Sequence, residues 1–167
     1  MIVAHVIGAL ALAMQPVSPM AGLDCAREVV SPAEREAMAD ALLNRAPSPF
    51  PEEMGLRLRA CGERAGHDAG TGRAFMMVAF TALAGEALRG RLAARNIDPA
   101  IVDAWYARQN GTTRIEYPDE AAAERMLLEL QAAGVPMAAL DEHGTMLGNY
   151  LATLIIPERV ARGLPPQ

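Results

Sequence analysis

Apolar residues recur at helical spacing through the first third of the chain, in segments bounded by helix start and stop signals. Ser31-Pro32-Ala33-Glu34 reads as a capping box with proline at the first helical position, so a helix is predicted from there to about Arg45. A second helix is predicted to start at Pro51-Glu52-Glu53, with its acids in the first turn. Its apolar stripe consists of Met54, Leu58, Cys61 and Ala65. Cys61 is therefore expected to face the core.

The segment from Ala74 to Leu88 is apolar nearly all round and is interrupted only by Thr81 and Glu86. A helix that is apolar on every side belongs in the interior of a protein, and this one is too short and interrupted to be a good membrane span. The pattern predicts a buried central helix over about 74–94.

Three more helices are predicted in the second half, over 98–110, 118–134 and 137–156. Pro157 is expected to end the last of them, ahead of a short helical tail. Only the stretch TTRIEY, residues 112–117, hints at a strand, and one strand cannot make a sheet. The fold class predicted is therefore all-α.

The elements together predict a compact bundle of five to six helices around the buried helix at about 74–94. The 167 residues suffice for one domain with its own core, which we place at 22–167. Two small-residue spacings, Thr81-x-x-x-Gly85 and Gly144-x-x-x-Gly148, permit close helix approach. We interpret both as packing positions, with a dimer face as the alternative.

The N-terminal segment resembles a signal peptide. Ile2 to Met14 is apolar except for His5, and about 13 residues span only about 20 Å as a helix, too little to cross a bilayer. We expect a signal peptide over 1–21, cleaved after Ala13 or Ala21, although no basic residue precedes Ile2. The alternative is an ordinary buried helix in a cytosolic protein that has no signal peptide.

The two cysteines support export. Cys25 and Cys61 lie beyond either cleavage point, and in an oxidising compartment they would most simply form a disulfide with each other. Closing that loop would stabilise the fold by roughly 3.8 kcal/mol in the chain-entropy model. The alternative is a pair of buried free thiols in a cytosolic protein. The expected location is periplasmic or secreted, and no transmembrane anchor is expected in the mature chain.

Charge and composition exclude several functions. The net charge of −5 gives no electrostatic reason to expect nucleic acid as a partner. All 15 basic residues are arginines, so lysine Schiff bases, a pyridoxal phosphate anchor and a P-loop lysine are excluded. No G-x-S-x-G elbow is present, and Ser18, Ser31 and Ser48 all precede proline, as cap or turn residues do. No catalytic residue and no cofactor are predicted.

The stretch GHDAGTGR, residues 66–73, combines a histidine, an aspartate and a threonine with three glycines, so we consider it first as a candidate site. Glu63 and His67 are four residues apart, and His143 would join them if the last helix packed against the second. Such a set is a candidate metal site, although zinc usually takes three or four protein ligands. The alternative is a solvent-exposed Glu–His pair near a helix C-terminus, where the helix dipole favours a histidine.

The same stretch also has the features of a joint between two helices. Gly66 can end the helix that carries Cys61, and Asp68 or Thr71 can cap the buried helix that follows. We favour this structural interpretation over a binding loop, because the glycines do not follow the phosphate-loop pattern and no lysine is available.

Two segments, GRLAARNIDPAIVDAWYARQ at 90–109 and IIPERVARGLPPQ at 155–167, look like parts of small exported helical proteins of bacteria that have no assigned activity. The resemblance covers about 25–164 and rests on caps and core positions. It implies a helical fold and an exported location, and it brings no mechanism.

The function expected from these observations is binding rather than catalysis. We expect an exported helical protein that binds a partner through a helix groove or helps to maintain the envelope, the partner being another protein or a second copy. One alternative is a small metal-dependent enzyme or metal carrier that uses Glu63, His67 and His143. The other is a cytosolic helical adaptor.

Overall fold

The computed structural model describes residues 17–45, 51–109, 111 and 119–165, and this part of the chain is helical with no strand. Its seven helices are α1 (Leu23–Val29), α2 (Pro32–Asn44), α3 (Glu52–Arg64), α4 (Ala69–Ala93), α5 (Pro99–Arg108), α6 (Glu120–Ala132) and α7 (Met137–Ala161). The all-α prediction is confirmed, with seven helices in place of the five to six expected. The strand suggested at 112–117 lies outside the described residues.

One additional helix and two helix boundaries differ from the prediction. Helix α1 was not expected, because about two turns are too short to give an apolar period. Helix α4 starts at Ala69, five residues before the expected position, because Asp68 caps it. Helix α7 runs through Pro157 to Ala161, so the predicted break there was wrong. Proline removes one backbone donor, but packing holds the last turn, where Arg159 is buried and hydrogen-bonds the carbonyl of Pro165.

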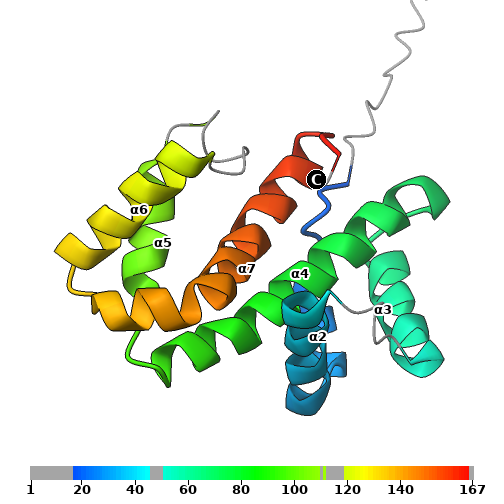
Figure 1. The fold of residues 1–167 in the computed structure, drawn as a ribbon. Helices are drawn as coiled ribbons and strands as arrows, with labels where there is room; N and C mark the ends of the chain where they lie inside the picture. Colours follow the sequence, from blue (N-terminus) through cyan, green and yellow to red (C-terminus); the bar gives the residue numbers. More distant parts are fainter. Residues whose placement is uncertain (1–16, 46–50, 110, 112–118, 166–167) are drawn as a thin grey trace, which may run out of the picture.

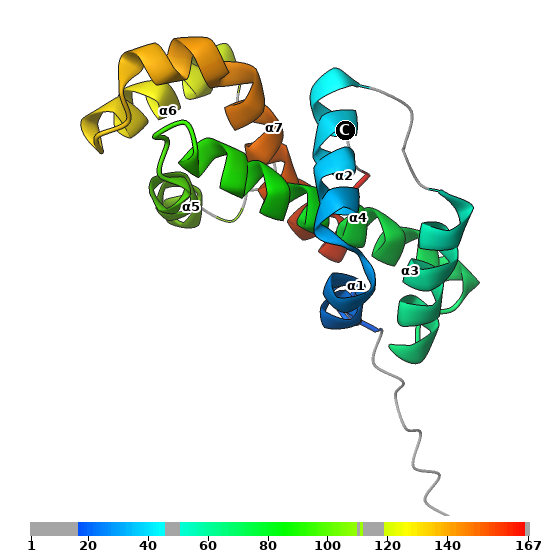
Figure 2. The ribbon, with the colours of Figure 1, turned by 90° about the horizontal axis from the view of Figure 1, so that it is seen from below.

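Helix α4 is the axis of the molecule, as predicted for the central apolar segment. Figures 1 and 2 show α3 beside its first half, α2 crossing its middle near α1, α5 and α6 beyond its second half, and α7 crossing it. The buried residues form two clusters along this axis. The N-terminal core contains Leu23, Ala26, Val30, Met38, Met54, Leu58, Cys61, Phe75, Val78, Ala79, Leu83 and Ala84. The C-terminal core contains Ala39, Ala87, Leu88, Leu92, Ile97, Val102, Met126, Leu130, Val135, Leu140, Met146, Leu147, Tyr150 and Leu151.

Helices α4 and α7 touch at a glycine. A Cβ atom added to Gly85 would lie 2.5 Å from Oγ1 of Thr153, so only glycine allows the two helices to approach this closely. Thr81, one turn earlier on α4, is buried and bonds back to the carbonyl of Met77. The Thr81–Gly85 spacing is therefore a packing motif, as predicted.

The disulfide joins α1 to α3. Cys25 and Cys61 lie at disulfide-bonding distance with their Cα atoms 5.7 Å apart, and Cys61 is fully buried, both as predicted. Because α1 and α3 both pack on the first half of α4, this link closes the N-terminal core covalently.

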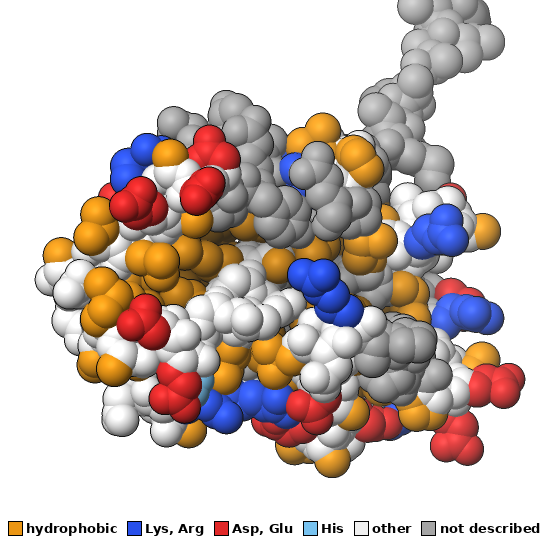
Figure 3. Space-filling model, viewed as in Figure 1, with side chains coloured by type: hydrophobic (Ala, Val, Ile, Leu, Met, Phe, Trp, Pro, Cys, Tyr) orange, Lys and Arg blue, Asp and Glu red, His pale blue; other side chains and the backbone are white. Residues whose placement is uncertain are grey.

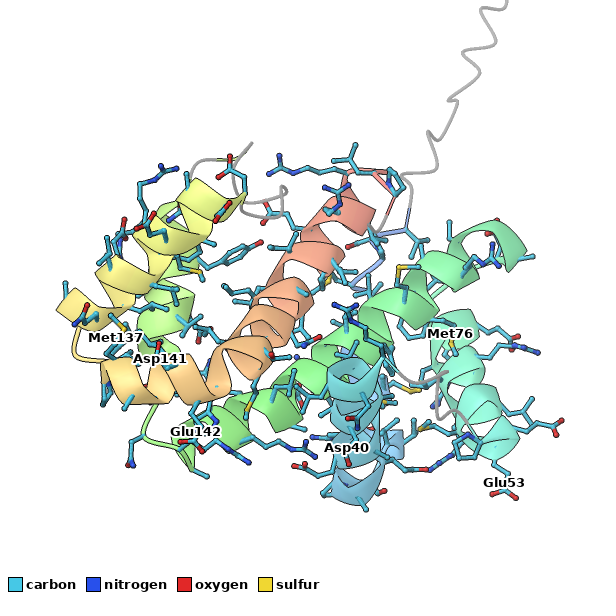
Figure 4. The ribbon with its side chains drawn as sticks, viewed as in Figure 1. Asp40, Glu53, Met76, Met137, Asp141 and Glu142 are labelled. Atoms are coloured by element: carbon cyan, nitrogen blue, oxygen red, sulfur yellow. A yellow bond between two sulfur atoms is a disulfide. The ribbon has the colours of Figure 1, made fainter. Side chains whose placement is uncertain are left out.

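Arginines tie the N-terminal helices to α4. Nε of Arg27 on α1 lies 2.7 Å from one carboxylate oxygen of Glu86, and Nη1 of Arg35 on α2 lies 3.0 Å from the other. One turn and a half later, Arg91 pairs with Glu36 and with Asp40, which Figure 4 labels on α2. Such partly exposed pairs contribute little energy individually, but together they fix the position of α1 and α2 on α4.

Candidate functional site

The stretch GHDAGTGR forms the joint between α3 and α4. Gly66 has a φ of +89°, its N–H donates to the carbonyl of Glu63, and the N–H of His67 donates to the carbonyl of Gly62. This pair of bonds is a Schellman stop, which needs a residue that adopts the left-handed conformation. The prediction that Gly66 ends the helix is confirmed.

Asp68 begins α4 with a reciprocal cap. Its Oδ1 accepts from the N–H groups of Gly70 and Thr71, and the hydroxyl of Thr71 accepts from the N–H of Asp68. The N–H of Thr71 is the main cause that lowers the pKa of the Asp68 carboxyl, so this group stays ionised and caps α4 at neutral pH. The predicted cap is confirmed.

His67 lies inside the molecule. Its side chain is 6% exposed, its ring stacks on Phe75 with centroids 4.9 Å apart, and Nε2 lies 3.0 Å from the carbonyl oxygen of Ala21. The interpretation of a solvent-exposed Glu–His pair was wrong. The chain just before α1, held near the joint by the disulfide at Cys25, covers the ring, and no local pattern in the sequence reports that contact.

One ring nitrogen of His67 has no partner in the described part of the chain. Because the carbonyl of Ala21 can only accept, Nε2 carries the proton in the neutral ring, and Nδ1 is left as an acceptor. Nδ1 is buried and no described residue donates to it. A buried acceptor without a partner raises the free energy of the folded state.

A cavity of about 530 Å³ lies beside His67, between α3 and the first turns of α4. We call it the joint cavity. Its lining consists of Arg59, Gly62, Glu63, His67, Asp68, Ala69, Gly72, Arg73, Phe75 and Met76. Figure 4 labels Met76 on α4 beside α3. Three charged side chains in this lining form no ion pair within the described residues, namely Arg59, Glu63 and Arg73.

The structure does not assemble the candidate metal site. His143 lies in the first half of α7, and its Nε2 is 3.7 Å from a carboxylate oxygen of its neighbour Glu142, which Figure 4 labels beside the end of α4. His67 precedes the first residue of α4, whose 25 residues span about 37 Å. Over the described ranges, no group of three or more His, Cys, Asp or Glu side chains could hold a metal ion, and Glu63, His67 and His143 all lie in those ranges.

A second cavity, of about 340 Å³, lies between α6 and α7. We call it the hairpin groove. Its lining consists of Ala123, Met126, Leu127, Leu140, Gly144, Leu147, Gly148, Leu151 and Ile155. Every one of these residues is apolar or glycine, and Figure 3 shows the groove as a hydrophobic hollow on the surface over α6 and α7.

The glycines of the hairpin groove are not packing positions. A Cβ atom added at Gly144 or Gly148 would meet nothing within 4 Å, in contrast to Gly85. The interpretation of Gly144-x-x-x-Gly148 as an internal packing motif was therefore wrong. The spacing instead leaves a stretch of bare helix backbone along α7 that faces the groove.

The α6–α7 hairpin, residues 119–156, carries the whole net charge of the protein. It contains six carboxylates and one arginine, whereas the rest of the chain contains fourteen of each, so the hairpin accounts for the net charge of −5. Figure 3 shows acidic side chains around the hollow, and Figure 4 labels Asp141 and Glu142 at one end of α7. Asp119, Glu120 and Glu124 surround a further shallow cavity at the start of α6.

A polar cluster joins α4, α5 and α7 outside both cavities. The hydroxyl of Tyr150 donates to Asp103 over 2.6 Å and accepts from Arg89 over 3.0 Å. Burial, followed by the hydrogen bond to Asp103, raises the pKa of Tyr150 to about 12. None of the three residues borders either cavity, so the cluster is a structural link between helices.

Over the described residues, no helix is both long and apolar enough to span a bilayer. None of the family models matches the chain, and no curated protein or solved structure matches it either.

Proposed function

We propose that the protein is an exported, non-enzymatic binding protein, and that its hairpin groove receives an apolar, positively charged helical segment of another protein. The observation that carries this proposal is the groove itself, a surface hollow lined only by apolar side chains and glycine. Open apolar hollows of this kind are characteristic of binding sites, because leaving apolar surface in water is unfavourable.

The bare backbone at Gly144 and Gly148 favours a helix as the occupant. Small residues four apart let a second helix approach the backbone closely, and no described helix takes that place. An amphipathic helix that lies in an apolar groove is a recurring mode of protein recognition.

Charge favours a basic partner over a second copy of this chain. A two-fold dimer through the groove would place the acidic hairpin against itself, and like charges across an interface are unfavourable. A helix with arginines or lysines beside its apolar face would instead complement the carboxylates that surround the groove.

Export is supported by three features of the sequence. The apolar segment from Ile2 to Met14 has the length of a signal-peptide core, and Cys25 and Cys61 form a pair that is typical of an oxidising compartment. The resemblance to small exported helical proteins of bacteria agrees with this location. Mass spectrometry of the protein from its natural source tests it. Loss of the first 13 to 21 residues supports export, and an intact N-terminus contradicts it.

The groove is tested by filling it. In Gly148→Leu the new side chain enters the groove from a position where a Cβ atom meets nothing, so the fold should be retained or stabilised. Gly90→Leu is the matched control, because Gly90 is also helical and exposed with nothing within 4 Å, but it lies on α4 outside the groove.

The probe is a synthetic amphipathic peptide of about 18 residues built from leucine and lysine, compared with the same design built from leucine and glutamate. We expect the protein and its Gly90→Leu variant to bind the lysine peptide, the glutamate peptide to bind at least about tenfold more weakly, and Gly148→Leu to lose the binding. Equal affinity for both peptides, or unchanged binding by Gly148→Leu, would contradict the proposal. The proposal would also be contradicted if the protein formed a dimer that Gly148→Leu dissociates, because a second copy would then occupy the groove.

A further inference from the structure

The hairpin groove is bounded by helix on three sides, because α7 bends at the foot of the groove. His143 has a φ of −116° and a ψ of 15°, so α7 changes direction between residues 137–142 and residues 144–161. In Figure 1 the first part of α7 runs across the end of the hairpin, and the second part rises from it. Leu140 of the first part, Leu151 of the second and Met126 of α6 all line the groove. The groove therefore has two long sides and one closed end.

The part of the lining that a partner can touch is uncharged. Gly144 and Gly148 are exposed, and Ala123 and Leu127 are half-buried, whereas the other lining residues are buried and form the floor of the groove. From Gly144 to Ile155 the helix rises about 17 Å, so the contact extends over about three turns of a partner helix. Because this lining has no charged side chain, a basic residue in the middle of the partner gains no ion pair there.

Carboxylates lie at both ends of the groove. Glu120 and Glu124 are in the first turns of α6, on either side of Ala123, and Asp141 is next to Leu140 at the closed end. The three acidic side chains are exposed, and none of them forms an ion pair within the described residues. Figure 3 shows acidic side chains on two sides of the hydrophobic hollow, and Figure 4 labels Asp141 at its foot. Negative charge therefore lies at each end of an uncharged contact.

We propose that the hairpin groove selects a helix whose basic side chains stand at both ends of an uncharged apolar face about three turns long. This inference rests on the proposed function and adds the placement of the partner's charges. The apolar face covers the exposed part of the lining, one basic end faces Glu120 and Glu124, and the other faces Asp141. Complementary charges at the edge of an interface fix the register in which the two surfaces meet, and here they set the position of the partner along α7.

Two synthetic peptides of identical composition test the placement of the charges. Both are amphipathic helices of about 18 residues with the same leucine face and with blocked termini, which carry no charge. The end-lysine peptide has its lysines at its two ends and glutamines between them, and the central-lysine peptide has the reverse order. Circular dichroism checks that their helix contents match. In calorimetric titrations at low salt we expect the end-lysine peptide to bind at least about fivefold more tightly.

Variants of the carboxylates locate the two ends. Asp141→Asn and the double variant Glu120→Gln/Glu124→Gln should each weaken binding of the end-lysine peptide by about two- to fivefold and leave the central-lysine peptide unaffected. The difference should shrink as salt is added, because these side chains are exposed. Glu52→Gln/Glu53→Gln is the matched control, since it removes two exposed acids from the first turn of α3, outside the groove. Unchanged affinity in the variants of both ends overturns the inference.

The inference and the proposed function fail in different ways. Equal affinity for the two lysine peptides, lost in Gly148→Leu, would overturn the placement of the charges and leave the proposed function in place. Absence of binding by either lysine peptide up to about 1 mM would overturn both.

Discussion

The helices around the two ends of α4 are held together in different ways. From its first turn to its middle, a disulfide and the ion pairs at Glu86 hold three short helices together against α4, and the charges outside the hairpin balance. Around its second half no disulfide is present, and α6 and α7 leave an apolar groove open under an acidic surface. The first region is cross-linked and has no net charge, whereas the second has no cross-link and is acidic. The contrast indicates that the cross-linked region is the more stable of the two.

Loss of the disulfide should have the largest effect on this contrast. The double substitution Cys25→Ala/Cys61→Ala releases the loop between α1 and α3, and we expect a loss of about 3.8 kcal/mol in the free energy of unfolding. Urea denaturation measures the loss. Hydrogen exchange should show that protection falls in α1 and α3 more than in α6 and α7. An equal fall in both halves would contradict the division between them.

The next largest effect comes from the same substitution at two glycines. Gly85→Ala forces a Cβ atom against Thr153 and should destabilise the protein by about 1–3 kcal/mol. Gly148→Ala meets nothing within 4 Å and should stabilise the protein by about 0.5–1 kcal/mol, because alanine favours the helix. Thermal denaturation of both variants gives the two signs. Removing the Thr153 hydroxyl with Thr153→Ala should recover part of the stability lost in Gly85→Ala. If Gly148→Ala also destabilised the protein, the groove would already be filled.

A smaller effect is expected at the ion pairs that α1 and α2 form with α4. Glu86→Gln removes the charge shared by Arg27 and Arg35. Because the carboxylate is about one-third exposed, we expect the free energy of unfolding to fall by only about 0.5–1 kcal/mol. The loss should shrink as salt is added, since screening weakens partly exposed pairs. Glu124→Gln, on the exposed face of α6, is the control and should leave stability unchanged. A loss that is independent of salt would mean that packing, not charge, is responsible.

An effect that appears only at alkaline pH is expected in the profile of Tyr150. Its pKa is raised to about 12 in the folded protein, above the ordinary value of 10. The folded state thus keeps the proton that the unfolded state gives up, so the stabilisation is complete below pH 10 and is lost as the pH rises to about 12. Tyr150→Phe should show a flatter decline of stability between these pH values. An identical alkaline profile in the two proteins would contradict the raised pKa.

Local signals in the sequence predicted the parts of the fold that depend on neighbouring residues. The cap at Asp68, the stop at Gly66 and the inward stripe through Cys61 all follow from residues within one or two turns. The pairing of the two cysteines followed from their number and from the expected compartment. These features required no knowledge of which helices meet.

The missed features all depend on contacts between distant segments. Gly85 and Gly148 each have a small residue four positions earlier, yet Gly85 lies against Thr153 and Gly148 faces the hairpin groove. The burial of His67 depends on Ala21, 46 residues away, and the helix continues through Pro157 because Arg159 is packed. The two cavities arise from the same kind of contact, so neither could be located from the sequence.

The position of Arg64 sets the route by which the disulfide exchanges with other thiols. Its Nη2 lies 2.9 Å from the sulfur of Cys25 and 3.5 Å from that of Cys61. Cys61 is fully buried, so an incoming thiolate reaches the partly exposed Cys25, and the electron pair leaves on Cys61 beside the guanidinium that stabilises it. The mixed disulfide therefore forms at Cys25, at the edge of the core, and the thiolate of Cys61 remains inside the core. The exposed side of this bond is therefore Cys25, while Cys61 stays covered by the helices around α4.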